Sequence, residues 1–217
     1  MTAPQSGTYV DDLSARARPG RSEPASSGTL VAGVDVGTTS VKAVLVDETG
    51  SVVARHRLPS QLSVGPGGQF EHDAASTWWE GPRRALAGVL QAQPPGALRA
   101  VAVSAMMPSV GAVNVAGEPI GPGLLYGDGR RAPNVGAEDA PSFDGNDPTA
   151  SDEMARLAGW AASHEPGASG FWPAQAVANA SLGGEGVIDY ASAMASGPLF
   201  NGSSWDEAAC ARAGLRP

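Results

Sequence analysis

Asp35 stands at the end of an apolar run, and a glycine and three hydroxyl-bearing residues follow it closely: Gly37, Thr38, Thr39 and Ser40. In a tight turn, the backbone N–H groups and hydroxyls of such residues can converge on one anion, and a glycine lets a ligand approach the backbone. A carboxylate beside an anion is unfavourable unless a divalent cation such as Mg²⁺ lies between them. The pattern therefore predicts half of a nucleotide-phosphate and magnesium site.

Alternatives for this segment stay open on the sequence alone. The same residues fit an ordinary hairpin in which Asp and Thr side chains bond to the backbone of their own turn. Lys42 is the only lysine in the chain. It can neutralise a bound phosphate, or it can be a solvated strand residue with no role in binding.

The elements that must position these residues are indicated by hydrophobic runs and turn signals. Strands are expected at residues 30–35, 41–47, 51–58, 98–104 and 110–115, and helices at 73–91 and 154–163. Asp73 can cap the first helix, in which Trp78, Leu86, Val89 and Leu90 fall near one face. A meander followed by a helix and a strand is typical of an α/β domain, and differs from the alternating pattern of a dinucleotide-binding fold.

Composition narrows the class of protein. The 217 residues have a formal net charge of −8, which disfavours nucleic acid or an anionic membrane as the partner. A single cysteine excludes an internal disulfide, so a reducing, cytoplasmic setting is expected. The histidines His56, His72 and His164 lack the spacing of a zinc site. Residues 1–28 are polar and rich in Gly, Pro, Ser and Arg, and are interpreted as a disordered leader before a domain at 29–217.

Three segments in order give the sequence a resemblance to a known family. They are DVGTTSVK at 35–42, GGQFEHDAASTWWEG at 67–81 and GEPIGPGLLYGDGRRA at 117–132. Together they resemble the FGGY carbohydrate kinases, most closely the xylulokinase-like branch, and the tail from residue 186 is also similar to a family stretch. The first segment is shared with the wider actin, Hsp70 and hexokinase superfamily, so it is the ordered set that makes the resemblance specific.

The resemblance implies a ribonuclease H-like domain of the actin-like ATPase superfamily, the first half of a two-domain sugar kinase. Such a kinase transfers a phosphoryl group from ATP, with Mg²⁺, to a sugar or polyol hydroxyl. The residues implied at the nucleotide are Asp35, Gly37, Thr38, Thr39, Ser40 and Lys42, with Asp35 at the metal. Those implied on the sugar side are Met107, Pro108, Asp128 and Arg130.

The sequence departs from the family in ways that affect the expected function. A Gln-Met-His-like stretch that touches the sugar in relatives is replaced here by Met106, Met107 and Pro108. Plain core packing is the alternative for Met106 and Met107, and it is favoured for Met106. Asp128 can be near the substrate, can be a structural partner of Arg130, or can belong to a solvated turn.

The catalytic aspartate and the second domain are expected beyond Pro217, so no catalytic residue is assigned within this chain. We therefore expect a kinase domain with little activity by itself. The alternative is a non-catalytic module that binds a sugar or a protein, with a homodimer or a second-domain partner possible. Asp189 fits either a position near the cleft or a helix cap. A third and weaker hypothesis is that the chain belongs to a different member of the actin-like ATPase superfamily.

Overall fold

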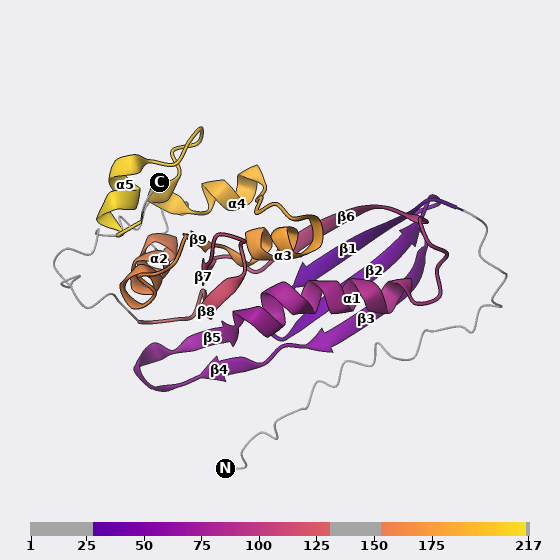
Figure 1. Ribbon diagram of the computed structural model, residues 1–217, viewed down its shortest axis with the longest axis horizontal. Coiled ribbons are helices and arrows are strands. Elements are labelled where there is room, and N and C mark those ends of the chain that lie inside the picture. The colour runs from indigo at the N-terminus through magenta and orange to yellow at the C-terminus, as the bar shows by residue number, and fades with distance from the viewer. Residues whose placement is uncertain (1–27, 131–152, 216–217) are drawn as a thin grey trace, which may run out of the picture.

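The computed structural model describes residues 28–130 and 153–215. The leader expected at 1–28 lies outside the described residues except for its last position. Within these ranges the chain forms two sheets with helices against them (Figure 1). No helix in these ranges is both long and apolar enough to cross a membrane.

The first sheet contains the predicted meander. Its strands are β1 (Leu30–Val36), β2 (Ser40–Asp47), β3 (Val52–Pro59) and β6 (Leu98–Ala105), in the order β3-β2-β1-β6. β1, β2 and β3 pair antiparallel, whereas β6 lies parallel to β1. β1 and β6 therefore end at the same edge of the sheet, which is where the predicted phosphate turn begins.

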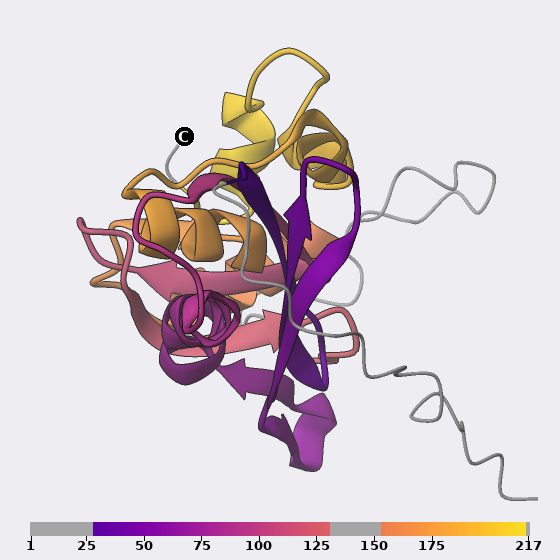
Figure 2. The ribbon, with the colours of Figure 1, turned by 90° about the vertical axis from the view of Figure 1, so that its right-hand side faces the viewer.

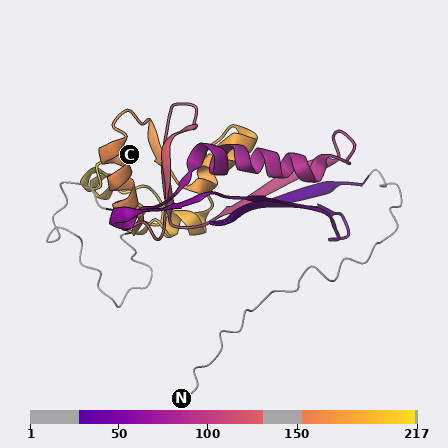
Figure 3. The ribbon, with the colours of Figure 1, turned by 90° about the horizontal axis from the view of Figure 1, so that it is seen from below.

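One face of this sheet is covered by α1 (Gly81–Leu90), which runs along it in Figure 3. The alternation in β1 explains the packing, because Ala32, Val34 and Val36 are buried while the residues between them are more exposed. In β2 the buried residues Val41, Ala43 and Leu45 continue the same core.

The second sheet was only partly predicted. It contains β4 (Leu62–Val64), β5 (Phe70–Asp73), β7 (Ser109–Val113), β8 (Pro119–Leu125) and β9 (Gly170–Trp172), in the order β4-β5-β8-β7-β9. The sequence indicated β7 but not its partners, since β4 and β9 are very short and β8 has the sequence PIGPGLL. Glycine and proline are unfavourable in strands, so pairing with β5 and β7 overrides local preference here.

The remaining elements are helical, and between them they contact strands of both sheets (Figure 2). They are η2 (Pro66–Gly68), η3 (Ala75–Glu80), α2 (Glu153–His164), α3 (Ala174–Gly183), α4 (Tyr190–Met194), η4 (Gly197–Leu199) and α5 (Glu207–Arg212). The helix predicted at 73–91 consists of η3, a stretch of π-helix, followed by α1. Its predicted cap is confirmed, because the Asp73 carboxylate accepts a hydrogen bond of 3.0 Å from the Ser76 N–H.

Trp78 is the largest fully buried side chain, and it lies where η3 meets the second sheet. Two glycines make room for its ring. A Cβ atom at Gly123 would lie 2.3 Å from the Trp78 ring, and one at Gly111 would lie 2.9 Å from it. Both distances are far below van der Waals contact, so β7 and β8 need glycine at these positions to receive the indole.

We predict that Gly123→Ala lowers the free energy of unfolding by about 1–3 kcal/mol, because the new methyl group must displace a rigid buried ring. Gly183→Ala is the matched control, since a Cβ there meets nothing within 4 Å. The control should be neutral or stabilising by up to about 1 kcal/mol. Urea denaturation measures the stability of both variants. Equal stability of the two would contradict the close packing of the Trp78 ring against Gly123.

Candidate functional site

The turn between β1 and β2 is tight. Val36 pairs with Val41, and the Gly37 N–H donates a hydrogen bond of 3.0 Å to the Ser40 carbonyl. A Cβ atom at Gly37 would lie 3.2 Å from that carbonyl oxygen and 3.6 Å from Asp35 Oδ2. Glycine therefore keeps open the space between the turn backbone and the carboxylate.

The carbonyl groups of the turn are held by the protein. Ser60 Oγ donates to the Gly37 carbonyl at 3.5 Å and the Ser60 N–H donates to the Thr39 carbonyl at 3.0 Å. His72 Nε2 lies 2.7 Å from the Thr38 carbonyl. Within the described ranges, no acceptor pairs with the backbone N–H groups of Thr38 and Thr39. The turn thus has its carbonyls satisfied and two amide donors available, which is the arrangement that binds an anion.

The hydroxyl groups of the turn differ in environment. Ser40 Oγ is buried, and it has no hydrogen-bond partner among the described residues. A buried hydroxyl without a partner is costly and uncommon. Thr38 Oγ1 lies 3.4 Å from the hydroxyl of Tyr126, while Thr39 is exposed. Tyr126 was not predicted as a site residue, although it belongs to the YGDGRR motif that was noted.

Asp35 and Lys42 face one another across the hairpin. They are directly paired in the β1–β2 register, and Lys42 Nζ donates to Asp35 Oδ2 at 3.0 Å. About half of each side chain is exposed, 52% for Lys42 and 46% for Asp35. An ion pair with this exposure contributes about 0–1 kcal/mol, so it rearranges easily when a ligand arrives.

The segment after β6 lies beside the turn. The Met106 N–H donates to the Val36 carbonyl at 3.1 Å, and the peptide bond between Met107 and Pro108 is cis. Met106 packs against the first core, as its alternative reading expected, and Met107 packs against the second core. Pro108 is partly exposed.

Ser109 fixes this segment and was missed by the sequence analysis. Its hydroxyl donates to the Met106 carbonyl at 3.0 Å and accepts from the Ala174 N–H, the first residue of α3, at 3.1 Å. A serine next to a proline gave no signal, because its partner in α3 lies 65 residues away in sequence.

Asp128 and Arg130 form an ion pair, in which Asp128 is 1% exposed. Arg130 Nε lies 3.0 Å from Asp128 Oδ1, and the Arg130 guanidinium also bonds to Glu71. The Phe70 N–H donates to Asp128 Oδ2 at 3.0 Å. The Arg130 guanidinium stacks 4.0 Å from the centre of the Trp160 ring. These contacts join β5, the end of β8 and α2, and we call them the Asp128 clasp.

Electrostatics favour the ionised form of Asp128. Burial by itself raises the pKa of a carboxylate, but hydrogen bonds from the Arg130 side chain and from the Phe70 and Arg130 N–H groups outweigh it. The pKa of Asp128 is therefore lowered from its ordinary value of 3.8. A carboxylate with this many donors holds a fixed position and is a weak proton acceptor.

Asp189 caps a helix in this structure. Its side chain accepts a hydrogen bond of 2.8 Å from the Ser192 N–H at the start of α4, and another of 2.8 Å from Gln175 Nε2. Gln175 also donates to the Val103 carbonyl on β6 at 3.1 Å. The cap reading of Asp189 is thus confirmed.

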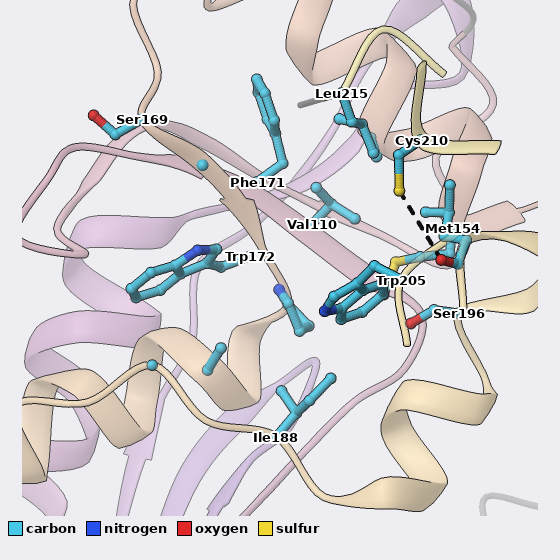
Figure 4. A pocket seen from close by; sticks show the side chains of 16 residues that line it. Val110, Met154, Ser169, Phe171, Trp172, Ile188, Ser196, Trp205, Cys210 and Leu215 are labelled. Atoms are coloured by element: carbon cyan, nitrogen blue, oxygen red, sulfur yellow. Dashed lines mark hydrogen bonds between the residues drawn. The ribbon is translucent and has the colours of Figure 1, made fainter. Parts of the chain in front are cut away.

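A separate cavity of about 350 Å³ lies between β9, α2, η4 and α5. Figure 4 shows Phe171, Trp172 and Trp205 around it, with Cys210 at one side. None of the predicted site residues lines it. Burial raises the pKa of the Cys210 thiol, and Asp206 adds to the effect, so this cysteine is a poor nucleophile.

The structure therefore brings some of the predicted site residues close together. The phosphate turn touches the Met106 segment through Val36, and it approaches the end of β8 through Tyr126. Among the described residues, no three His, Cys, Asp or Glu side chains cluster as metal ligands. Asp35, beside open amides and a glycine-lined space, has the composition of a Mg²⁺ site that is completed by phosphate oxygens and water.

Comparisons with known proteins agree with this geometry. Residues 30–137 match the N-terminal domain of the FGGY family of carbohydrate kinases. A xylulose kinase of Streptomyces coelicolor is 32% identical over 207 residues, which cover 89% of this chain and 42% of that protein. The chain thus spans about two-fifths of the length of the curated relatives it matches.

Solved structures show the same fold. A xylulose kinase from Rhodospirillum rubrum aligns with a TM-score of 0.71 and 26% identity, over 87% of this chain and 42% of that one. A Plasmodium falciparum glycerol kinase aligns with a TM-score of 0.65 at 16% identity, over 87% of this chain and 42% of that one. The expected fold, a ribonuclease H-like kinase domain, is confirmed.

The Asp128 clasp yields a prediction for stability. Asp128→Asn should lower the free energy of unfolding by about 3 kcal/mol at neutral pH, because it removes the most buried charge partner of Arg130 and leaves the guanidinium with Glu71 alone. Glu48→Gln removes an exposed carboxylate and should change stability by less than about 0.5 kcal/mol.

The same pair of variants should show a pH signature. Because the pKa of Asp128 is lowered in the folded state, its stabilisation of the fold is complete above pH 3.8, the ordinary pKa. The stabilisation is lost as the pH falls through the folded-state pKa. The difference between the wild type and Asp128→Asn should therefore shrink in acid. A difference that is small at pH 7, or constant down to pH 2, would contradict this assignment.

Proposed function

The chain belongs to the FGGY family of carbohydrate kinases and carries its N-terminal domain, and from this premise we propose that it supplies the phosphate turn and one wall of the sugar site of an ATP-dependent kinase. The acceptor would be a hydroxyl of a sugar or polyol. The relatives named as xylulose kinases make a ketose the first candidate. We assign no catalytic base to the described residues, so the activity proposed for this chain by itself is binding rather than turnover.

The observation that supports the proposal most directly is the polarity of the turn. Its carbonyl groups are bonded to Ser60 and His72, so they do not face an incoming anion, while the amides of Thr38 and Thr39 have no partner among the described residues. Phosphoryl transfer depends mostly on positioning and charge neutralisation. A turn that is already fixed needs little rearrangement to bind phosphate.

Asp35 is the residue proposed to hold Mg²⁺, and Gly37 leaves the space beside it. When bound, Mg²⁺ neutralises phosphate charge and orients the phosphate oxygens. Lys42 is proposed to exchange its bond with Asp35 for a phosphate oxygen, since its ion pair is exposed and weak. The unpartnered Ser40 hydroxyl offers a further donor close to the turn.

For Asp128, Arg130 and Met107, which the resemblance places on the sugar side, the geometry supports indirect roles in shaping the sugar site. Both carboxylate oxygens of Asp128 accept hydrogen bonds from the protein, so we propose that Asp128 and Arg130 shape the wall that carries Tyr126. Pro108 is partly exposed and can contact the sugar, whereas Met107 supports that segment from the core. The packing of Met106 against the first core also favours the alternative function, a module that binds without catalysis, because Met106 stands where relatives have the Gln of the stretch that touches the sugar.

We predict that ADP with Mg²⁺ perturbs the amide NMR signals of Thr38 and Thr39, and that Mg²⁺ tightens ADP binding about ten-fold or more. Asp35→Asn should abolish the tightening by Mg²⁺. In the absence of Mg²⁺ it should leave ADP affinity unchanged or improved, since a repulsive carboxylate is gone.

The matched control is Asp47→Asn, which changes a carboxylate at the far end of β2. An Asn side chain can still accept the turn bonds that Asp47 accepts from Thr49 and Ser51. The control should keep the effect of Mg²⁺. ADP signals that appear elsewhere, or an unchanged effect of Mg²⁺ in Asp35→Asn, would overturn the proposed site.

A further inference from the structure

His72 is a buried histidine whose two ring nitrogens are both engaged. It is 1% exposed, its Nε2 lies 2.7 Å from the Thr38 carbonyl, and its Nδ1 accepts a hydrogen bond of 3.1 Å from Trp78 Nε1. The histidine belongs to β5 of the second sheet, and Thr38 belongs to the turn of the first. In the sequence, His72 was noted only as one of three histidines that lack the spacing of a zinc site.

We propose that Trp78 and His72 act as positioning residues for phosphate binding, in a chain of hydrogen bonds from the indole through a neutral imidazole to the carbonyl of Thr38. The inference rests on the proposed function of the turn. Its consequence is that the orientation of the Thr38–Thr39 peptide, and hence of the Thr39 amide donor, depends on which nitrogen of His72 carries the proton.

The tautomer follows from the donors and acceptors present. An indole N–H can only donate, so Nδ1 of His72 must be the nitrogen without a proton. A carbonyl can only accept, so Nε2 must carry the proton that bonds to Thr38. A doubly protonated imidazole would place an N–H against the indole N–H, and one of the two bonds would be lost.

Among the described residues, no charged side chain bonds to the ring of His72, and the elements packed around it carry few charges. The packed strands β4 and β8 have no ionisable side chain, and neither has α3 behind η3. On β5, Glu71 bonds to Arg130 and Asp73 caps Ser76. The exposed Glu80 ends η3, and Asp35 and Lys42 of the hairpin pair with each other.

The protonation of His72 sets the direction of the pH effect. Burial lowers the pKa of His72 from its ordinary value of 6.5, and the bond to the Thr38 carbonyl opposes this without reversing it. Both bonds are therefore present above pH 6.5. As the pH falls below 6.5 through the folded-state value, Nδ1 gains a proton and the bond from Trp78 is lost, so the imidazole that holds the Thr38 carbonyl loses its fixed orientation.

Trp78 can hold the tautomer because it cannot move. Its ring is fully buried and is confined by the backbones of Gly111 and Gly123, where added Cβ atoms would lie 2.9 Å and 2.3 Å from it. A fixed donor gives the imidazole a fixed orientation, and a mobile ring would not. The glycines of β7 and β8 thereby contribute to the phosphate turn without touching it.

The first measurement is the ¹⁵N NMR tautomer signature of His72 in the full chain, which needs no substitution. We expect the neutral form with the proton on Nε2 at pH 7, and conversion to imidazolium only below pH 6.5. A proton on Nδ1, or an imidazolium at pH 7, would overturn the proposal.

The second measurement compares Trp78→Phe with Trp79→Phe. Trp79 is the matched control, because its ring is partly exposed and lies 4.5 Å from the Arg83 guanidinium. Trp78→Phe should raise the pH at which His72 becomes protonated, and should weaken binding of ADP with Mg²⁺ about three- to ten-fold at pH 7, the size expected for one hydrogen bond. Trp79→Phe should leave both quantities unchanged. Equal effects of the two variants would contradict the proposed chain of hydrogen bonds from Trp78 through His72 to Thr38.

A third variant keeps the test independent of the fit of the Trp78 side chain. His72→Gln removes the imidazole, so the hydrogen-exchange protection of the hairpin amides should lose its dependence on pH between 7 and 5, while His164→Gln at an exposed position should keep it. A dependence that persists in His72→Gln would overturn the inference. If the wild type binds no ADP, the proposed function fails, but the tautomer and exchange measurements still decide the role of His72.

Discussion

The hydrogen bond between His72 and the Thr38 carbonyl connects the two sheets at the point where the candidate site forms. The turn belongs to the first sheet, but a carbonyl at its tip is held by the second. A peptide group has an N–H and a C=O on opposite sides, so fixing the carbonyl of Thr38 also fixes the direction of the next amide. The anion-binding character of the turn is therefore a property of both sheets and not of the hairpin alone.

Other contacts place the rest of the site relative to this bond. The Met106 N–H, just after β6, donates a hydrogen bond to the Val36 carbonyl at the end of β1. Ser109 bonds the same segment to the start of α3. The Asp128 clasp holds the end of β8, which brings Tyr126 to the hydroxyl of Thr38. Ser109 and Asp128 each bond through a side chain to a backbone group of another element, which keeps the parts in register although they are distant in sequence.

How much of this could be predicted depends on the range of each interaction. The hairpin from Asp35 to Lys42 was predicted well because its alternation, its glycine and its hydroxyls are local signals, and α1 followed from its apolar face. The second sheet was predicted only at β7, because Gly121, Pro122 and Gly123 disfavour β8 as a strand in isolation. Gly123 is required by Trp78, whose ring is packed there from a distance of 45 residues in sequence, a constraint that propensity cannot express.

The candidate site residues also divide into those with local sequence signals, which could be predicted, and those whose partners are distant in sequence, which could not. The pairing of Asp128 with Arg130 lies within one motif and was anticipated, but Glu71, the other partner of Arg130, lies 59 residues away. The family resemblance indicated Met107 as a sugar contact because of its position after β6, and its packing against the second core could not be read from the position alone. Ser60, His72 and Ser109 act on backbone carbonyls and amides, and such partners leave no pattern of residue types in the sequence.

A turn that binds phosphate faces opposite requirements, since it must present N–H groups outward and must not present the carbonyls that accompany them. Glycine at position 37 allows the close approach but also gives the backbone freedom to reverse. The bonds from Ser60 and His72 remove that freedom at three successive carbonyls. Donors of fixed orientation are more effective than mobile ones, because they need no reorganisation when charge arrives. On this argument the second sheet is needed for the proposed phosphate binding even where it contributes no atom to the proposed site.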